Sequence, residues 1–182
     1  MSDWTDETID WYAENFGDDP TVFAMLDVVP VPGTAAVLDV GCGTGSALRA
    51  LVGRTTGALA GVDPFARMIG HAERLTKAAG LGARIDFSVA PAEALGMPDT
   101  GFDVVLALNA IHHWADINAG LAEAFRVLRP GGVLAIGGEK FGVDALGRAQ
   151  DYTAELAQAG FVPGDATRSS DLFYQLSHKA PK

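Results

Sequence analysis

The sequence has 182 residues, 48% of them hydrophobic, which suits one compact domain but not a second sizeable one. No apolar run reaches the roughly 18 residues that span a bilayer, no basic and apolar leader opens the chain, and the single cysteine excludes an internal disulfide. The net charge is −10, and Lys and Arg form no stripe that would follow a phosphate backbone. We therefore expect a cytoplasmic protein with neither nucleic acid nor membrane as partner.

The first 20 residues are acidic, with seven acids and no Lys or Arg. Aromatic and aliphatic side chains recur among these acids at near-helical spacing, which predicts an amphipathic helix over 4–16. A second short helix is predicted over 21–29, ended by Pro30 and Pro32. Residues 1–34 thus form an N-terminal helical segment, whose acidity also serves solubility.

From residue 35 onward, short apolar runs alternate with helical patterns. Strands are predicted over 36–40, 58–62, 84–89, 102–108 and 132–137, helices over 46–52, 65–79, 116–128 and 145–159, and a closing hairpin from 161–167 and 172–178. This alternation predicts an α/β fold of three layers, with helices on both faces of a doubly wound, mostly parallel seven-stranded sheet that has one antiparallel strand.

A glycine loop follows the first of these strands. Gly41, Gly43 and Gly45 lie between that strand and the next helix, where the backbone can approach a ligand closely and helix N–H groups point at it. The spacing is Gly-x-Gly-x-Gly, which differs from the dinucleotide-binding pattern, and no Lys-Ser/Thr pair of a phosphate-binding loop follows.

Two aspartates sharpen this interpretation. Asp39 lies inside an otherwise apolar strand, where a buried carboxylate needs donors from a ligand ammonium or from backbone N–H groups. Asp63 ends the second strand, where an acid accepts hydrogen bonds from both hydroxyls of a ribose. It also suits a helix cap before Pro64, and the two roles are compatible. The spacing favours an adenosine-type ligand.

Four segments, in order, resemble the class I S-adenosylmethionine-dependent methyltransferases of the small-molecule type. They are VLDVGCGTG (37–45), GVDPFARMIGHAE (61–73), APAEALGMPDTGFDVVLALNAIHHW (90–114) and AFRVLRPGGVLAI (124–136). The resemblance implies a Rossmann-like methyltransferase fold over 35–182, with S-adenosylmethionine as cofactor, S-adenosylhomocysteine as product and a small molecule as substrate.

The resemblance also implies roles for matching positions in cofactor binding. The 41–45 loop would pack against the methionine part, Asp39 would stabilise its ammonium and Asp63 would hold the ribose. Cys42 would be a small residue chosen for its backbone, although a lone cysteine also invites a nucleophile hypothesis. The remaining implied contacts are Pro64 and Met68 beside adenine, Ala92 offering its N–H to the ring, and Asn109 and Ala110 at the methionine end.

The chain departs from the family at two places. Pro91 stands where the family usually has an acid that reads the adenine amino group, so we expect Glu93, Asp99 or backbone atoms to take that role. The spacer after the fifth strand, 139–144, is also shorter than the usual substrate-covering insertion. The substrate would then be covered by residues 4–16 acting as a lid, by the second subunit of a homodimer, or hardly at all.

Methyl transfer from a sulfonium needs a base only where the acceptor must lose a proton. His112 or His113 is the candidate base, and the alternative is that the pair packs under the ligand or caps the loop. A second cluster, Glu139 to Phe141, follows the fifth strand, where Glu139 would orient the substrate. Trp11 and Tyr12 would form an aromatic wall or simply the apolar face of a helix.

Three functions remain open at this point: methylation of a small molecule at O, N or C, binding of S-adenosylmethionine without transfer, and a nicotinamide-dependent oxidoreductase on a similar sheet. The glycine spacing argues against the last. No Cys/His spacing matches a metal site.

Overall fold

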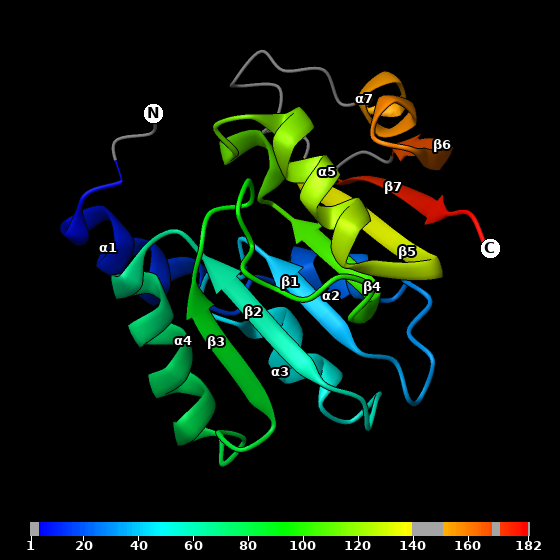
Figure 1. The fold of residues 1–182 in the computed structure, drawn as a ribbon. Helices are drawn as coiled ribbons and strands as arrows, with labels where there is room; N and C mark the ends of the chain where they lie inside the picture. The colour runs from blue at the N-terminus through cyan, green and yellow to red at the C-terminus, as the bar shows by residue number, and fades with distance from the viewer. Residues whose placement is uncertain (1–3, 140–150, 169–171, 182) are drawn as a thin grey trace.

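The computed structural model describes residues 4–139, 151–168 and 172–181, and its centre is a seven-stranded sheet (Figure 1). β7 is antiparallel to β5 and β6, and the other pairs are parallel, which confirms the predicted mixed sheet with one antiparallel strand. The order across the sheet is β3-β2-β1-β4-β5-β7-β6. The strands are β1 (Val37–Val40), β2 (Leu59–Asp63), β3 (Ile85–Val89), β4 (Phe102–Leu108), β5 (Leu128–Glu139), β6 (Phe161–Arg168) and β7 (Leu172–Lys179).

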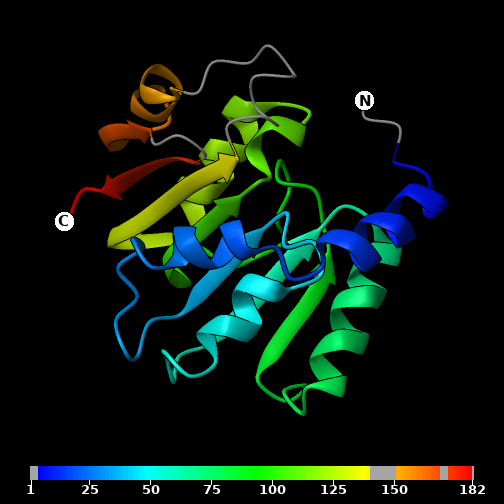
Figure 2. The same ribbon diagram turned by 180° about the vertical axis from the view of Figure 1, so that it is seen from behind.

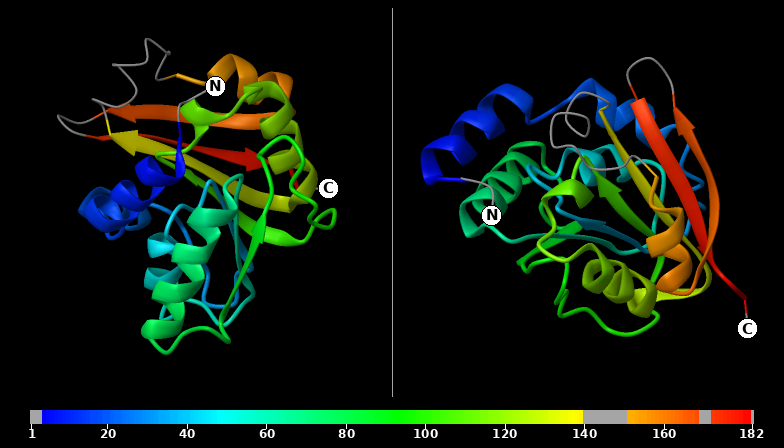
Figure 3. Two further views of the ribbon diagram at one scale, coloured as in Figure 1. Left: turned by 90° about the vertical axis from the view of Figure 1, so that its left-hand side faces the viewer. Right: turned by 90° about the horizontal axis from the view of Figure 1, so that it is seen from above.

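Helices cover both faces of the sheet. One apolar cluster joins α2, α3 and α4 to one face, and a second cluster joins α5 and α7 to the other. Figures 1 and 2 show these layers from opposite sides, and Figure 3 shows the sheet between them from above. The helices are α1 (Asp6–Phe16), α2 (Pro20–Leu26), α3 (Ser46–Leu51), α4 (Ala66–Ala78), α5 (Ile117–Val127) and α7 (Thr153–Gln158), with the 3₁₀ turn η1 (Ile111–His113).

Local signals explain most element boundaries. The Asp116 side chain caps α5 by accepting a hydrogen bond from the Ala119 N–H at 3.0 Å, as the sequence predicts. β4 is an almost continuous apolar run because both of its faces are covered by helices. Every predicted strand is present.

Most boundaries lie within two residues of prediction, and three differ by more. α2 ends at Leu26, three residues before the predicted end. β5 begins at Leu128 rather than 132, because Leu128 pairs with Phe102 across a register shift that no local pattern reveals. The sequence predicts a helix over 145–159. Residues 145–150 lie outside the described residues, and in the described remainder α7 begins at Thr153.

The strand order places a crevice at the carboxyl end of the sheet. From β1 the chain winds outward through β2 and β3 in one direction, and through β4 and β5 in the other. Such a switch of direction opens a crevice beyond the strand ends, which is where open α/β sheets bind ligands. α1 lies at this end of the sheet beside the start of α4 (Figure 1). Within the described ranges, no helix has the length and apolarity to cross a membrane.

Candidate functional site

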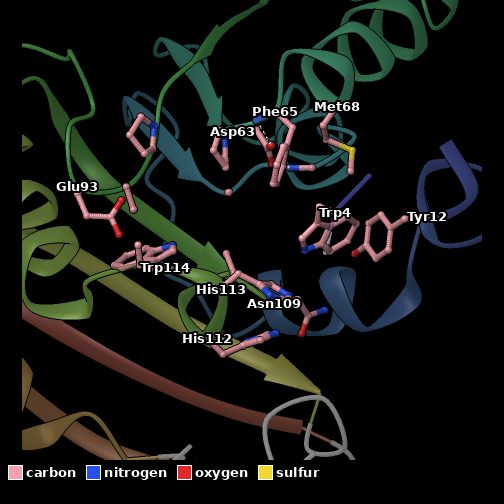
Figure 4. A pocket seen from close by; sticks show the side chains of 17 residues that line it. Trp4, Tyr12, Asp63, Phe65, Met68, Glu93, Asn109, His112, His113 and Trp114 are labelled. Atoms are coloured by element: carbon pink, nitrogen blue, oxygen red, sulfur yellow. Dashed lines mark hydrogen bonds between the residues drawn. The ribbon is translucent and has the colours of Figure 1, made fainter. Parts of the chain in front are cut away.

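A cavity of about 810 Å³ lies at the carboxyl ends of β1, β2 and β4 (Figure 4). It falls within the range of roughly 300–1,000 Å³ that is common for small-molecule sites. A smaller hollow of about 50 Å³ adjoins it and shares four residues with it: Tyr12, Gly41, Gly43 and Asn109. Most predicted site residues line the cavity: Gly41, Gly43, Asp63, Pro64, Met68, Ala92, Glu93, Asn109, Ala110, His112 and His113.

The three glycines of the loop have different reasons to be glycine. All have positive φ, +77° at Gly41, +51° at Gly43 and +77° at Gly45, a region that favours glycine. A Cβ on Gly41 would lie 2.6 Å from the Ala110 Cβ, whereas one on Gly43 would meet nothing within 4 Å. A Cβ on Gly45 would lie 2.7 Å from the Phe87 ring. Gly41 and Gly43 line both hollows. Gly45 lines neither, and its lack of a side chain lets the Phe87 ring pack against the loop.

Asp63 ties the loop to the end of β2. Its Oδ2 accepts a hydrogen bond from the Gly43 N–H at 3.2 Å, and its Oδ1 accepts one from the Phe65 N–H at 3.0 Å. The second bond belongs to the turn that begins α4, so the carboxylate supports this turn and also faces the cavity. Burial raises the pKa of Asp63, and the two backbone N–H groups oppose that rise.

Asp39 is a buried carboxyl group without a full set of partners. Its side chain is 2% exposed, and its Oδ1 has no hydrogen-bond partner among the described residues. Burial, and next the charge of Asp63, raise the pKa of Asp39 to about 7. The group lines the smaller hollow, beside Gly41 and Gly43. A cationic ligand there would supply the missing donor and favour the ionised carboxylate.

Cys42 lies in the loop, but its thiol packs inward. A Cβ on Gly61 of β2 would lie 2.9 Å from the Cys42 Sγ, so the sulfur fills the space under the loop. Burial raises the pKa of this thiol well above its ordinary value. A protonated, enclosed thiol is a poor nucleophile, so the geometry supports the small packing residue rather than the nucleophile.

Another part of the cavity is lined by Pro64, Met68, Pro91, Ala92 and Glu93. Glu93 already accepts a hydrogen bond from the Asp116 N–H, at 2.9 Å. The expected contribution of Asp99 is wrong: this carboxylate pairs with Arg126 at 2.6 Å and does not line the cavity.

The turn after β4 carries the two histidines into the cavity. Asn109 has a φ of +52°, which is uncommon outside glycine, and its N–H donates to the Gly137 carbonyl at 2.8 Å. This bend directs η1, where the His112 and His113 ring centroids lie 4.1 Å apart. His112 is 9% exposed, whereas His113 is exposed. For the second predicted cluster, the Glu139 side chain and residues 140–141 lie outside the described residues.

The N-terminal segment reaches the cavity through two aromatic side chains. Trp4 and Tyr12 line it, and the Trp4 ring centroid lies 5.3 Å from that of Tyr12, 6.1 Å from that of Phe65 and 5.7 Å from that of His113. Figure 4 shows Trp4 and Tyr12 on the α1 side, opposite Glu93. Trp4 thus connects the start of the chain to η1.

Polar contacts hold α1 in this place. The Arg67 Nε of α4 donates to the Asp10 Oδ1 at 2.7 Å, and the His71 Nε2 lies 2.7 Å from the same oxygen. Arg74 donates to the His71 Nδ1 at 2.9 Å, so the Nε2 carries the proton that bonds Asp10. Arg67 and His71 lower the pKa of Asp10. Just after α1, the Thr44 hydroxyl of the glycine loop donates to the Gly17 carbonyl at 2.6 Å.

Sequence reasoning missed several of these residues. Phe65 lines the cavity, Thr44 ties the loop to the N-terminal segment, and Asp10 anchors α1. The position of Phe65, directly after Asp63 and Pro64, was an available signal. Asp10 carried none that distinguished it from the other six acids. Across the described ranges, no group of three or more His, Cys, Asp or Glu side chains is arranged to hold a metal ion.

Comparison with known proteins agrees with this geometry. The profile of a family described as "Methyltransferase domain" matches residues 38–136. The ubiquinone biosynthesis O-methyltransferase of Rhizobium rhizogenes is 35% identical over 127 residues, which is 70% of this chain and 48% of that protein. The chain therefore spans about half the length of this curated relative.

Two solved structures share the fold at low sequence identity. A SAM-dependent methyltransferase from Aquifex aeolicus is 20% identical, with a TM-score of 0.82 over 97% of this chain and 100% of that one. The [4+2]-cyclase SpnF is 18% identical, with a TM-score of 0.77 over 90% of this chain and 82% of that one. Proteins with different reported activities thus share this architecture.

Proposed function

Because this chain belongs to the class I S-adenosylmethionine-dependent methyltransferases, we propose that it transfers a methyl group from S-adenosylmethionine to a hydroxyl group of a small-molecule acceptor. The observation that carries the proposal is the pair of buried aspartates on either side of the glycine loop. Among the described residues the Asp39 Oδ1 has no hydrogen-bond partner, and Asp63 faces the cavity. Together they suit a ligand that has an ammonium group at one end and a ribose next to it.

Each part of the donor has residues that fit it. Asp39 and the backbone around Gly41 to Gly43 would hold the ammonium in the smaller hollow, since a cation supplies what the Asp39 Oδ1 lacks. Asp63 would accept the ribose hydroxyls while it keeps its two backbone bonds, because a carboxylate offers about four acceptor sites.

The adenine ring would lie among Pro64, Met68 and Ala92, with Asn109 and Ala110 at the methionine end. Pro91 stands in place of the family's acid, and the Glu93 carboxylate already accepts a hydrogen bond from the Asp116 N–H. The adenine ring would therefore be held by apolar contacts and backbone groups.

When bound, the cofactor supplies a methyl group activated by a sulfonium. The chain then has to place the acceptor oxygen in line with that methyl and remove its proton. His112 and His113 are the groups in the cavity suited to the second task, because an imidazole accepts protons near neutral pH. The Trp4 ring packs edge-on against His113 and would help to fix the orientation of this imidazole.

The choice of a hydroxyl acceptor is supported by the curated relative, which is an O-methyltransferase. We further propose that residues 1–34 act as the lid of a donor-binding domain over 35–182, since Trp4 and Tyr12 already wall the cavity. A homodimer is the other way to cover the acceptor, and sedimentation would identify it.

The second candidate is a protein that binds the donor without transferring its methyl group. The proline at position 91 favours it, and the cyclase with the same fold is a precedent for another activity on this architecture.

Calorimetry with S-adenosylhomocysteine and NAD, followed by turnover of methyl-labelled donor with a panel of phenols and alcohols, tests the proposal. We expect binding of the sulfur ligand, no binding of NAD, and labelled ether products. Donor binding without any labelled product would support the second candidate, and binding of NAD alone would refute both.

A further inference from the structure

Four aromatic side chains, one just before α1 and three on it, form a continuous track, which we call the aromatic track: Trp4, Tyr12, Phe16 and Trp11. The ring centroids of Trp4 and Tyr12 lie 5.3 Å apart, those of Tyr12 and Phe16 lie 5.5 Å apart, and those of Phe16 and Trp11 lie 5.4 Å apart. These separations are typical of aromatic rings in direct contact. The track starts inside the cavity, where Trp4 and Tyr12 line it.

The outer half of the aromatic track is open to solvent. Trp11 is 56% exposed and Phe16 is 44% exposed, although each has a large apolar ring. Single exposed apolar residues are ordinary, but a contiguous exposed group marks a binding surface more often. Here the group is also continuous with the site, because Phe16 lines the smaller hollow together with Tyr12, and Tyr12 lines both hollows.

The charges around the aromatic track restrict what binds there. Glu7 and Glu14 are exposed and lie four residues before and three residues after Trp11, so helical spacing places them beside it. Asp6, Asp10 and Asp18 pair with Arg67 and Arg49, which offset part of their charge, whereas Glu7 and Glu14 have no ion pair among the described residues. Such a surface repels carboxylates, phosphates and anionic lipid membranes.

We propose that the acceptor is a molecule with an extended apolar body and no negative charge, which lies along the aromatic track while its reacting hydroxyl enters the cavity beside His113. This inference rests on the proposed function, since it takes the cavity as the site of methyl transfer. It adds that the substrate is longer than the cavity and that α1 selects it by apolar contact. Trp11 and Phe16 are then residues that determine substrate specificity, rather than exposed side chains of α1 without a role in binding.

The test is a chain-length series of 4-alkylcatechols with methyl, butyl and octyl groups, titrated by calorimetry into protein saturated with S-adenosylhomocysteine. We expect affinity to rise roughly tenfold or more from methyl to octyl, because each methylene that leaves water contributes up to about 0.8 kcal/mol. The octyl compound with a terminal carboxylate should bind more weakly than octyl itself. Trp11→Ala and Phe16→Ala should each remove most of this gain in affinity, because each removes apolar surface that the alkyl chain would contact. Both variants are expected to fold, because both side chains are exposed.

Phe23→Ala is the matched control, because Phe23 is an aromatic residue of α2 that is 36% exposed and not part of the aromatic track. It should keep the full gain. Equal affinities across the series, or an octyl affinity unaffected by Trp11→Ala, would overturn the inference. So would conversion of a dimer into a monomer by Trp11→Ala, since the track would then be an interface between copies. Absence of S-adenosylhomocysteine binding would refute the proposed function itself, and a flat series with that ligand bound would refute this inference alone.

Discussion

Replacing Asp39 with asparagine removes a charge from the interior while it keeps the shape of the side chain. In the folded protein without ligand, burial and the charge of Asp63 raise the pKa of Asp39 from 3.8 to about 7. A carboxyl group with a raised pKa contributes stability that is fully present below pH 3.8 and is lost as the pH rises through about 7. The wild-type protein therefore loses stability through this group as the pH rises from 3.8 to beyond about 7, and the asparagine variant does not.

The magnitude follows from the size of the shift. About three pH units correspond to roughly 4 kcal/mol at 1.36 kcal/mol per unit. About 1.7 kcal/mol of this is already present at pH 5, so roughly 2.6 kcal/mol develops between pH 5 and pH 8. The amide of the variant has its own cost of burial, but that cost does not change with pH. The difference between the two proteins should therefore move by roughly 2–3 kcal/mol in favour of the variant over this interval.

Urea unfolding of both proteins without ligand at pH 5, 6, 7 and 8, at constant ionic strength, measures that difference. Asp86→Asn, at an exposed position of β3, controls for the chemical change itself. The same Asp39 variant should bind S-adenosylhomocysteine more weakly by roughly 1.5–3 kcal/mol, the scale of a hydrogen bond to a charged group. A stability difference that stays constant from pH 5 to 8 would contradict the raised pKa, and unchanged ligand affinity would remove Asp39 from the site.

The remaining predictions concern the ribose acid, the histidines and the N-terminal helix. Asp63→Ala should weaken S-adenosylhomocysteine by roughly 1–3 kcal/mol, measured by calorimetry on the folded variant; unchanged affinity would exclude Asp63 from binding. Replacing the catalytic member of the His112–His113 pair with alanine should lower kcat by roughly 10²–10⁴-fold and remove the rising limb of the pH–rate profile, whereas full activity in both single variants would show that the pair only packs. Asp10→Ala should release α1 from α4, which speeds amide exchange over 4–16 and raises the acceptor KM more than the S-adenosylhomocysteine Kd. Glu14→Ala, on the same helix, is its control, and equal exchange in the two variants would argue against the anchoring role of Asp10.

Much of the fold could be predicted because its signals are local. The strand β4 is recognisable from an apolar run of its own length, and the Asp116 cap from one residue before α5. The loop after β1 is recognisable from its glycines, because positive φ is costly for other residues. The start of β5 was missed because it depends on pairing with Phe102, 26 positions earlier in the chain.

The candidate site divides in the same way. The positions of Asp39 and Asp63 follow from the ends of two parallel strands, which must meet at one edge of the sheet. The role of Asp99 could not be decided in this way. Its position in the sequence lies close to residues that line the cavity, but in the folded protein its carboxylate forms an ion pair with Arg126 instead.

The sequence by itself determined the sheet, the glycine loop and the order of the motifs, because turn preference and apolar periodicity act over a few residues. Only the tertiary structure decided which acid anchors α1: Asp10 contacts both Arg67 and His71, which follow 57 and 61 residues later, whereas the ion pair of Asp6 among the described residues is with Arg67 at 3.6 Å. It also decided that Trp4 and Tyr12 wall the cavity while Trp11 continues outward from them. Those outcomes depend on which helix faces pack together, and the free energy of packing is a property of the assembled surfaces rather than of any one segment.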